Sequence, residues 1–264
     1  MSKEDDRSLR FYQEVLGLDH LHYGMWLEDE ELTLANLKAA QLRYEDFLIE
    51  KIPPQTKKVL DVGCGTSAMT QRMLSMGMEV QGLSPDVTQK NNFTKNLNVP
   101  FHHCRFEDLD TQETFDCLVM SESAQYIPYD RLFENARKIL APGGYILICD
   151  YFVLEETTGV LAKSGHKLNA FKAESERRGF TLLEECDITN SISKTLDLGN
   201  LLANRVLKGL DIITEKVRRK RPLLTRFVFR LFRKKWQKLE RNRVLLDSEE
   251  FKSNKRYLFL LYQA

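Results

Sequence analysis

The chain has 264 residues, of which 42% are hydrophobic and 29% charged, so it is long enough to bury a sizeable core. These values exclude a globally disordered chain, and no apolar run reaches the roughly 18 residues of a transmembrane helix. Residues 1–10 are charged and lack the apolar region of a signal peptide, so we expect a cytoplasmic protein. The five cysteines are far apart and share no metal-ligand spacing with a histidine, which predicts free thiols and no metal site.

The net charge of +1 hides a strong asymmetry between the two parts of the chain. Residues 1–204 carry 21 Lys and Arg against 32 Asp and Glu, whereas residues 205–264 carry 18 against 6. The basic C-terminal part is therefore suited to an anionic partner, such as a membrane surface, a nucleic acid or an acidic substrate.

Apolar runs alternate with helical patterns through most of the chain. Two helical stretches come first, at 7–16 and 32–49. Strands are then predicted at 58–62, 78–84, 100–106, 114–120, 145–150, 180–184 and 256–262, and helices at 70–76, 87–97, 131–140 and 170–178. This alternation indicates βαβ units, and hence a doubly wound α/β sheet of seven strands, mostly parallel and covered on both faces.

Segments outside this alternation suggest additions to a Rossmann-like core. Residues 1–50 are expected to form an N-terminal helical lid ahead of a core spanning residues 51–186. Residues 187–255 are mostly helical in pattern and basic, which is typical of a cap inserted before a final strand in residues 256–264.

A glycine-containing turn follows the first predicted strand, in the string VLDVGCGT at residues 59–66. One glycine lets the backbone turn sharply, and a second lets a ligand approach without a Cβ in the way. The helix that follows presents N–H groups that favour a negatively charged ligand group. The turn lacks the third glycine of a dinucleotide fingerprint, which argues against a pyrophosphate cradle.

This string, the Phe115-Asp116 pair before the fourth strand and the LAPGG string at 140–144 together resemble the class I S-adenosylmethionine-dependent methyltransferases. Three further strings, LHYGMW at 21–26, GLSP at 82–85 and MSES at 120–123, resemble a small-molecule subgroup of that family. The subgroup includes tocopherol-type, sterol-type, sugar-O-methyl and cyclopropane-fatty-acid-synthase enzymes. The resemblance implies the cofactor S-adenosylmethionine and a small, often lipid-like acceptor.

The resemblance assigns residues to the amino-acid and ribose parts of the cofactor. Asp61, Gly63 and Gly65 would hold the amino-acid part, although Asp61 could instead cap the next turn. Ser84 stands where most family members place a carboxylate for the ribose hydroxyls, and a hydroxyl is a weaker partner. Gln89 would add ribose or adenine contacts, or be an ordinary amide on a helix surface.

The loop after the third strand departs from the adenine-binding pattern of the family. Arg105 occupies the usual position of an aspartate that accepts the adenine amino group, so Glu107 is the expected substitute acceptor. Phe106 would cover the adenine face, and Ser121 would border the ligand site at the end of the fourth strand.

Two aromatic residues near the N-terminus are assigned to the cofactor by the same resemblance. Tyr23 would bind the cofactor carboxylate or lie against the positively charged sulfonium, with Trp26 beside it. The alternative is that both rings pack in a core.

The histidine that serves as base in related enzymes is absent, since the stretch after the fourth strand reads ESAQYIP. Glu122 borders the site, and Gln125 and Tyr126 occupy the usual positions of the base. The acceptor could arrive ionised, Tyr126 could take part, or a base such as His166 could come from elsewhere; His166 could equally be an exposed loop histidine.

Residues 216–243 hold 13 Lys and Arg and one acidic residue, with apolar residues at helical spacing. This pattern is typical of an interfacial membrane helix, although a cap helix packed on the domain would look similar. A nucleic-acid substrate is disfavoured because the N/D-P-P-Y/F motif of base-methylating enzymes is absent.

The sequence therefore predicts a methyltransferase that acts on a small, hydrophobic or lipid-linked acceptor, by O- or C-methylation, at or near the membrane. A degenerate cofactor-binding protein without turnover and a cyclopropane-synthase-like lipid-modifying enzyme are the alternatives. The pattern does not reveal an oligomeric state.

Overall fold

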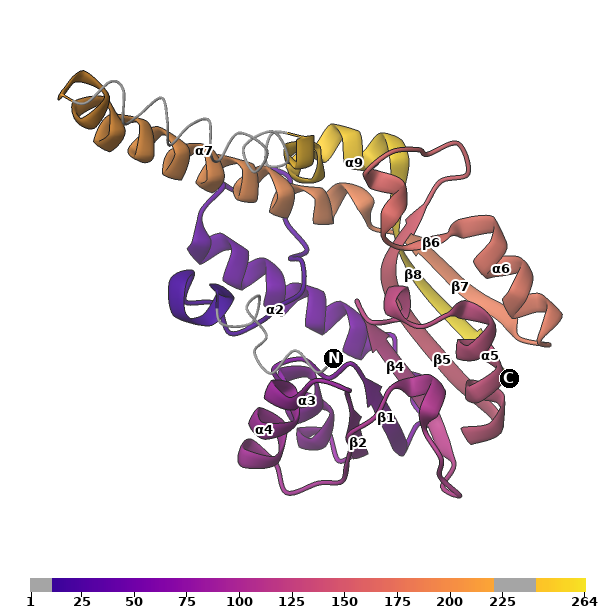
Figure 1. The fold of residues 1–264 in the computed structure, drawn as a ribbon. Helices are drawn as coiled ribbons and strands as arrows, with labels where there is room; N and C mark the ends of the chain where they lie inside the picture. Colours follow the sequence, from indigo (N-terminus) through magenta and orange to yellow (C-terminus); the bar gives the residue numbers. More distant parts are fainter. Residues whose placement is uncertain (1–10, 221–240) are drawn as a thin grey trace.

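The computed structural model describes residues 11–220 and 241–264, which form a mixed α/β fold (Figure 1). The strands are β1 (Lys58–Val62), β2 (Glu79–Leu83), β3 (Phe101–His102), β4 (Phe115–Ser121), β5 (Leu140–Val153), β6 (His166–Lys167), β7 (Thr181–Asp187) and β8 (Lys255–Gln263).

The α-helices of the described part alternate with the strands. They are α2 (Leu34–Glu50), α3 (Ala68–Ser75), α4 (Val87–Asn96), α5 (Tyr129–Ile139), α6 (Leu168–Arg177), α7 (Thr189–Lys220) and α9 (Ser248–Asn254). Shorter turns of helix are η1 (Phe11–Val15), η2 (Phe106–Asp108), η3 (Ala124–Tyr126), η4 (Leu161–Lys163) and η5 (Arg243–Leu246).

The strands form one sheet in the order β3-β2-β1-β4-β5-β8-β7, with β6 paired to β5 off this path. Strands β1 to β5 pair in parallel with one another, and β8 runs antiparallel between β5 and β7. The predicted doubly wound sheet is confirmed, but in the described residues it has eight strands instead of the expected seven, because the short β6 also pairs with β5. Because the carboxyl ends of β1, β2, β4 and β5 meet at one edge, the loops that follow these strands lie close together.

Both faces of the sheet are covered, and β5 shows this most clearly. Ile146 and Ile148 belong to one buried cluster with α5 and α6, whereas Leu147 and Cys149 belong to another with α2, α3 and α9. Successive side chains of a strand point to opposite faces, so a strand buried on both faces reads as a continuous apolar run. This explains why the apolar run YILICD at residues 145–150 predicts a strand.

Strands β3 and β5 differ most in length from the prediction. Strand β3 has only two residues rather than the span 100–106, because the chain turns into η2 and buries Phe106. Strand β5 continues past Asp150 to Val153, because β8 pairs with it from Tyr145 to Val153. Sequence propensity alone does not reveal such a long antiparallel partner.

The N-terminal segment and α7 lie against each other. The Trp26 indole nitrogen donates to the Thr195 hydroxyl at 2.9 Å, and the Gly24 N–H donates to the same oxygen at 3.1 Å. The first predicted helix appears within the described residues only as η1, and the second is α2, capped by the Thr33 hydroxyl.

The far end of α7 projects away from the sheet (Figure 1). Most of the basic stretch 216–243 that was assigned to an interfacial helix lies outside the described residues. None of the helices in residues 11–220 and 241–264 combines the length and apolarity needed to cross a bilayer.

Candidate functional site

The turn after β1 is built from left-handed backbone conformations at alternating positions. Gly63, Gly65 and Ser67 have φ values of +78°, +52° and +68°. Only glycine adopts this region freely, so Ser67 is strained. Ser67 also makes no side-chain cap for α3, which leaves N–H groups at the start of that helix available to an anion.

The two glycines have different roles. A Cβ on Gly63 would lie 2.5 Å from the Cβ of Ser123, whose hydroxyl donates to the Val62 carbonyl at 2.5 Å, so Gly63 lets the loop after β4 pack on the turn. A Cβ on Gly65 would meet nothing closer than 3.9 Å, and Leu21 lies on that side at 4.0 Å. The space for a ligand is therefore beside Gly65.

Asp61 is fully buried beneath this turn. Its carboxylate accepts a hydrogen bond from the Thr70 hydroxyl of α3 at 2.5 Å. Burial raises the pKa of Asp61 to about 6, with the Glu45 carboxylate adding to the rise and Thr70 opposing it. A cationic group beside Asp61 would restore its charge, which is what a ligand ammonium would do.

The residues after β2 are organised around the glycine turn. Ser84 is buried, and its hydroxyl accepts the Asp86 N–H at 3.1 Å. Asp86 caps α4 by accepting the Gln89 N–H at 2.8 Å. The Gln89 side chain in turn accepts the Gly65 N–H at 3.2 Å. The structure thus brings Gln89 and Gly65 together, and Gln89 is not a mere surface amide.

The loop after β3 pairs Arg105 with the expected adenine acceptor. The Arg105 guanidinium lies 3.6 Å from a Glu107 carboxylate oxygen. Phe106 is 2% exposed within the core, and its carbonyl is held by the Asn135 side chain. Glu107 is available to a ligand amino group only in competition with Arg105.

A buried polar network lies at the end of β4. The Glu122 carboxylate accepts the Tyr257 hydroxyl at 2.6 Å and the Tyr23 N–H at 2.8 Å. The Tyr44 hydroxyl is 3.1 Å from that of Tyr257 and 3.0 Å from that of Ser121. Burial raises the pKa of Glu122, against the opposing effects of His22, Tyr257 and Tyr23. Glu122 also has a left-handed φ of +54°, a strain typical of functional positions.

The two N-terminal aromatic residues have different surroundings. Trp26 is 3% exposed and packs with Leu18, Leu37 and Leu198, so its ring lies in a hydrophobic core, which was the alternative to a cofactor contact. The Tyr23 ring lies edge-on to Tyr257, with centroids 5.7 Å apart, so it borders the network at the end of β4.

The candidate bases are held apart. Tyr126 is 77% exposed on η3, whereas the Gln125 N–H donates to the buried Asp150 carboxylate at 2.9 Å. His166 is partly buried, stacks on Phe171 and has its Nε2 2.9 Å from the Ala124 carbonyl. Because a carbonyl only accepts, Nε2 carries the hydrogen and His166 supports the loop instead of lying exposed.

Several of these residues have no motif in the sequence. Tyr44, Asp150 and Tyr257 come from α2, β5 and β8, and only the fold brings them beside Glu122 and Gln125. The one feature of the sequence that could have pointed to them is a polar residue within an otherwise apolar run, such as Asp150 at the end of YILICD.

Comparisons with known proteins agree with this geometry. Residues 59–144 match a family model described as a methyltransferase domain. Tocopherol O-methyltransferase from Arabidopsis thaliana is 29% identical over 163 residues, which cover 52% of this chain and 47% of that protein. Residues 59–144 therefore match a methyltransferase domain, in agreement with the family resemblance of the sequence, and the chain is similar to small-molecule methyltransferases.

Solved structures resemble the chain over nearly its whole length. A protein described as a sarcosine dimethylglycine methyltransferase from Galdieria sulphuraria superposes with a TM-score of 0.73 at 15% identity, covering 98% of both chains. The geranyl diphosphate C-methyltransferase from Streptomyces coelicolor A3(2), solved with Mg²⁺, geranyl diphosphate and S-adenosyl-L-homocysteine, gives 0.67 at 14% identity, covering 98% of this chain and 97% of the other. At such identities the likeness concerns the fold. The sequence match spans about half of the tocopherol enzyme.

The methyltransferase cofactor fits the residues at the glycine turn. The open side of Gly65 admits a ligand, the start of α3 suits its carboxylate, and Asp61 suits its ammonium. S-adenosylmethionine supplies a methyl group bound to a sulfonium, which is already activated for displacement.

Proposed function

We propose that this chain transfers a methyl group from S-adenosylmethionine to a small, hydrophobic or lipid-linked acceptor, at oxygen or carbon, at or near a membrane surface. The open face of Gly65 above the buried Asp61 is the observation that carries the cofactor assignment. Relatives and neighbours whose names include tocopherol and geranyl diphosphate support an acceptor with a prenyl-like chain.

The residues around the end of β4 would orient the acceptor and exclude water. Tyr23 and Tyr257 close the buried side of this region, and Ser121 presents a hydroxyl that is already joined to Tyr44. Methyl transfer depends mainly on alignment and desolvation, so a rigid network suits it.

Proton removal has a candidate in Asp150. Burial raises the pKa of this carboxyl to about 8, which is the range of a useful base near neutral pH. Asp150 is joined to the Gln125 N–H, so it lies behind the loop that carries Gln125 and Tyr126. His166, with its Nε2 directed to the Ala124 carbonyl, would act through Nδ1 if it acts at all.

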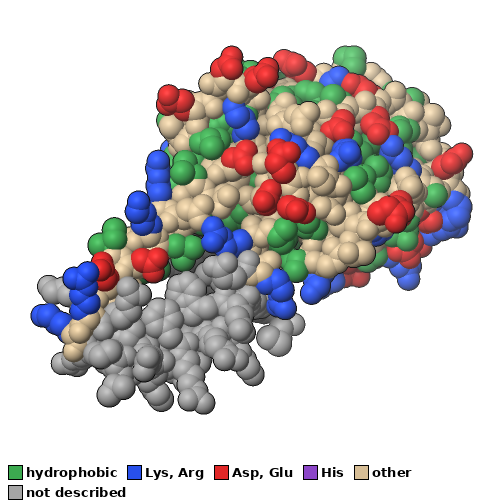
Figure 2. All heavy atoms as spheres, turned by 90° about the horizontal axis from the view of Figure 1, so that it is seen from above, with side chains coloured by type: hydrophobic (Ala, Val, Ile, Leu, Met, Phe, Trp, Pro, Cys, Tyr) green, Lys and Arg blue, Asp and Glu red, His purple; other side chains and the backbone are tan. Residues whose placement is uncertain are grey.

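The exposed end of α7 supports membrane docking. Val206, Leu210 and Ile213 follow one another at helical spacing and are 63%, 46% and 68% exposed. Lys208, Asp211 and Glu215 fall on the opposite side of the helix. Figure 2 shows hydrophobic, basic and acidic side chains together on this projecting part. An apolar row on a basic element is suited to an anionic lipid surface.

The cofactor assignment is tested by calorimetric titration with S-adenosylhomocysteine. Gly65→Ala should weaken binding at least about tenfold, because the Cβ and the unfavourable φ disturb the cradle. Gly77→Ala is the matched control, since Gly77 has a φ of +85° and equally open surroundings outside the site. Equal affinities of the two variants would refute the assignment.

The membrane assignment is tested by flotation with phosphatidylserine vesicles. Leu210→Asp with Ile213→Asp should reduce vesicle binding, as should neutralising Arg226, Arg230, Arg233 and Lys234. Met76→Asp, at a residue 56% exposed on another element, is the control and should float like the wild type. Unchanged flotation of both test variants would contradict docking.

A second candidate keeps the cofactor and lacks turnover. Ser84 and Arg105 replace carboxylates that most family members carry, and the histidine base is absent, which together are also what a degenerate cofactor-binding protein would show. Formation of S-adenosylhomocysteine with prenylated phenols or unsaturated fatty acids as acceptors distinguishes the two, and a cyclopropane product would assign the lipid-modifying reaction instead.

A further inference from the structure

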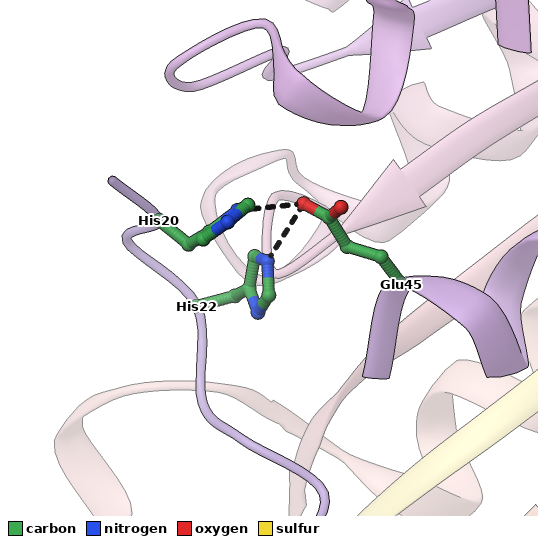
Figure 3. Close-up of side chains that lie close together, drawn as sticks. All are labelled: His20, His22 and Glu45. Carbon is green, nitrogen blue, oxygen red and sulfur yellow. Dashed lines mark hydrogen bonds and ion pairs between the residues drawn. The ribbon is translucent and has the colours of Figure 1, made fainter. Parts of the chain in front are cut away.

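Two histidines of the N-terminal segment converge on one carboxylate of α2 (Figure 3). His20 Nδ1 lies 2.8 Å and His22 Nε2 3.2 Å from the same oxygen, Oε1 of Glu45. All three atoms lie within 4.8 Å of one another. Imidazole nitrogens and a carboxylate oxygen are the ligands of Zn²⁺ sites, in which neighbouring ligands of a tetrahedral ion are separated by about 3.3 Å.

The backbone of this segment is fixed by a residue one helical turn away from Glu45. The buried Gln41 side chain donates to the carbonyl oxygens of His20 at 3.2 Å and His22 at 2.7 Å. Gln41 and Glu45 are four residues apart and lie on the same face of α2. One side chain therefore holds the backbone of both histidines while the other meets their rings.

The contacts with Glu45 require a positive charge between these groups, which either a protonated imidazole or a bound cation supplies. His22 Nδ1 is 2.8 Å from the Tyr23 carbonyl and must donate to it. In a neutral ring Nε2 then has a lone pair that faces the lone pairs of Glu45. His20 Nδ1 is buried and, although close to Glu45, lacks the geometry of a hydrogen bond. A bound cation satisfies all three atoms, and a ligating histidine typically donates its other N–H in this way.

The charges around the cluster favour a cation at Oε1. Glu45 is buried, and the Arg72 guanidinium occupies its second oxygen, Oε2, at 3.2 Å. Two further carboxyls are near, the buried Asp61 and the partly buried Glu122, since Glu45 acts on Asp61 and His22 acts on Glu122 through space. Arg72 also pairs with Asp46, so its charge is shared between two carboxylates.

We propose that His20 Nδ1, His22 Nε2 and Glu45 Oε1 bind one Zn²⁺-type divalent ion, which fastens the N-terminal segment to α2. The fastened segment includes Leu21, which lies beside Gly65, and Tyr23, whose N–H holds Glu122. The ion would thus keep the segment closed over the glycine turn. This last consequence rests on the proposed function, whereas the ion site does not.

The site is tested on the full chain after chelation and desalting, by titration with Zn²⁺ and by visible absorption with Co²⁺. One ion per chain should bind, and His20→Ala or Glu45→Gln should weaken binding at least about 100-fold, beyond the loss typical of outer-shell residues. Asp46→Asn is the matched control, because Asp46 also pairs with Arg72 but does not belong to the cluster of His20, His22 and Glu45. Absence of stoichiometric binding, or equal affinities of wild type and His20→Ala, would overturn the proposal.

Closure of the segment is tested by the dissociation rate of S-adenosylhomocysteine with and without Zn²⁺. Zn²⁺ should slow dissociation in the wild type and have no effect on His20→Ala. Zn²⁺ binding with an unchanged dissociation rate would overturn the closing role. If S-adenosylhomocysteine failed to bind at all, the proposed function would fail while the Zn²⁺ titration still decided the ion site.

Discussion

The hydroxyl of Tyr257 donates to the Glu122 carboxylate at 2.6 Å and so joins the last strand of the chain to the end of β4. The two residues are 135 positions apart. The Tyr44 hydroxyl, 3.1 Å from that of Tyr257, extends the network to α2. One buried carboxyl thereby holds together the N-terminal segment, the sheet and the region where an acceptor would lie.

Removing this hydroxyl should destabilise the protein. Tyr257→Phe leaves the buried Glu122 with one donor fewer and deprives Tyr44 of a partner, so we expect a loss of about 1–3 kcal/mol in the free energy of unfolding. Urea denaturation followed by circular dichroism measures it. Tyr126→Phe, at a side chain that is 77% exposed, should change stability by less than about 0.5 kcal/mol. Equal stabilities of both variants would show that the network contributes nothing.

Stability should fall as the pH rises through the titration of Asp150. Burial raises the pKa of this carboxyl from 3.8 to about 8, so the folded state binds its proton more tightly than the unfolded state. The stabilisation that Asp150 contributes is therefore fully present below about pH 4 and is lost as the pH rises to about 8. Asp61, with a pKa raised to about 6, and Glu122 act in the same direction. Lys255, whose pKa burial lowers to about 8, affects stability mainly above that pH.

Asp150→Asn isolates the contribution of this one carboxyl. Its unfolding free energy should decline less than that of the wild type between pH 5 and pH 8. Urea denaturation at both pH values measures the difference. Asp130→Asn, at an exposed carboxyl, serves as control and should follow the wild type. Parallel pH profiles of Asp150→Asn and wild type would contradict the raised pKa.

The N-terminal segment should loosen when Thr195 loses its hydroxyl. Thr195→Val leaves the Gly24 N–H and the Trp26 indole N–H without their acceptor, at a cost of about 1–3 kcal/mol each when buried. Hydrogen exchange at Gly24 should accelerate at least about tenfold. In the control Thr214→Val, the lost hydroxyl bonds only carbonyls of its own helix. Exchange at Gly24 that is the same in both variants would argue against this contact.

Arg105 should compete with the adenine amino group for Glu107. Arg105→Ala frees the carboxylate, so S-adenosylhomocysteine should bind about two- to tenfold more tightly, whereas Glu107→Gln should weaken binding. Calorimetry measures both, and Arg131→Ala, which removes an exposed cation elsewhere, is the control. Unchanged affinity in Glu107→Gln would exclude Glu107 as the acceptor.

The sequence predicted most of the fold because its signals are local. A strand buried on both faces, such as β5, needs an apolar run, and a turn such as that at Gly65 needs glycine. The short β3 and the extended β5 were not predictable, because β3 ends where the chain turns into η2 to bury Phe106, and β5 is extended by pairing with the distant β8. The roles of Ser84 and Tyr126 remain predictions.

By itself the sequence determined most of the order of strands and helices, the glycine turn and the resemblance to methyltransferases, since each depends on neighbouring residues. Only the tertiary structure decided which polar groups meet. Glu122 with Tyr257, Asp150 with Gln125, and His20 with Glu45 come from segments 25 to 135 residues apart. Hydrogen bonds and ion pairs act over a few ångströms, so their partners are fixed by how helices and strands pack, and no spacing along the chain encodes them.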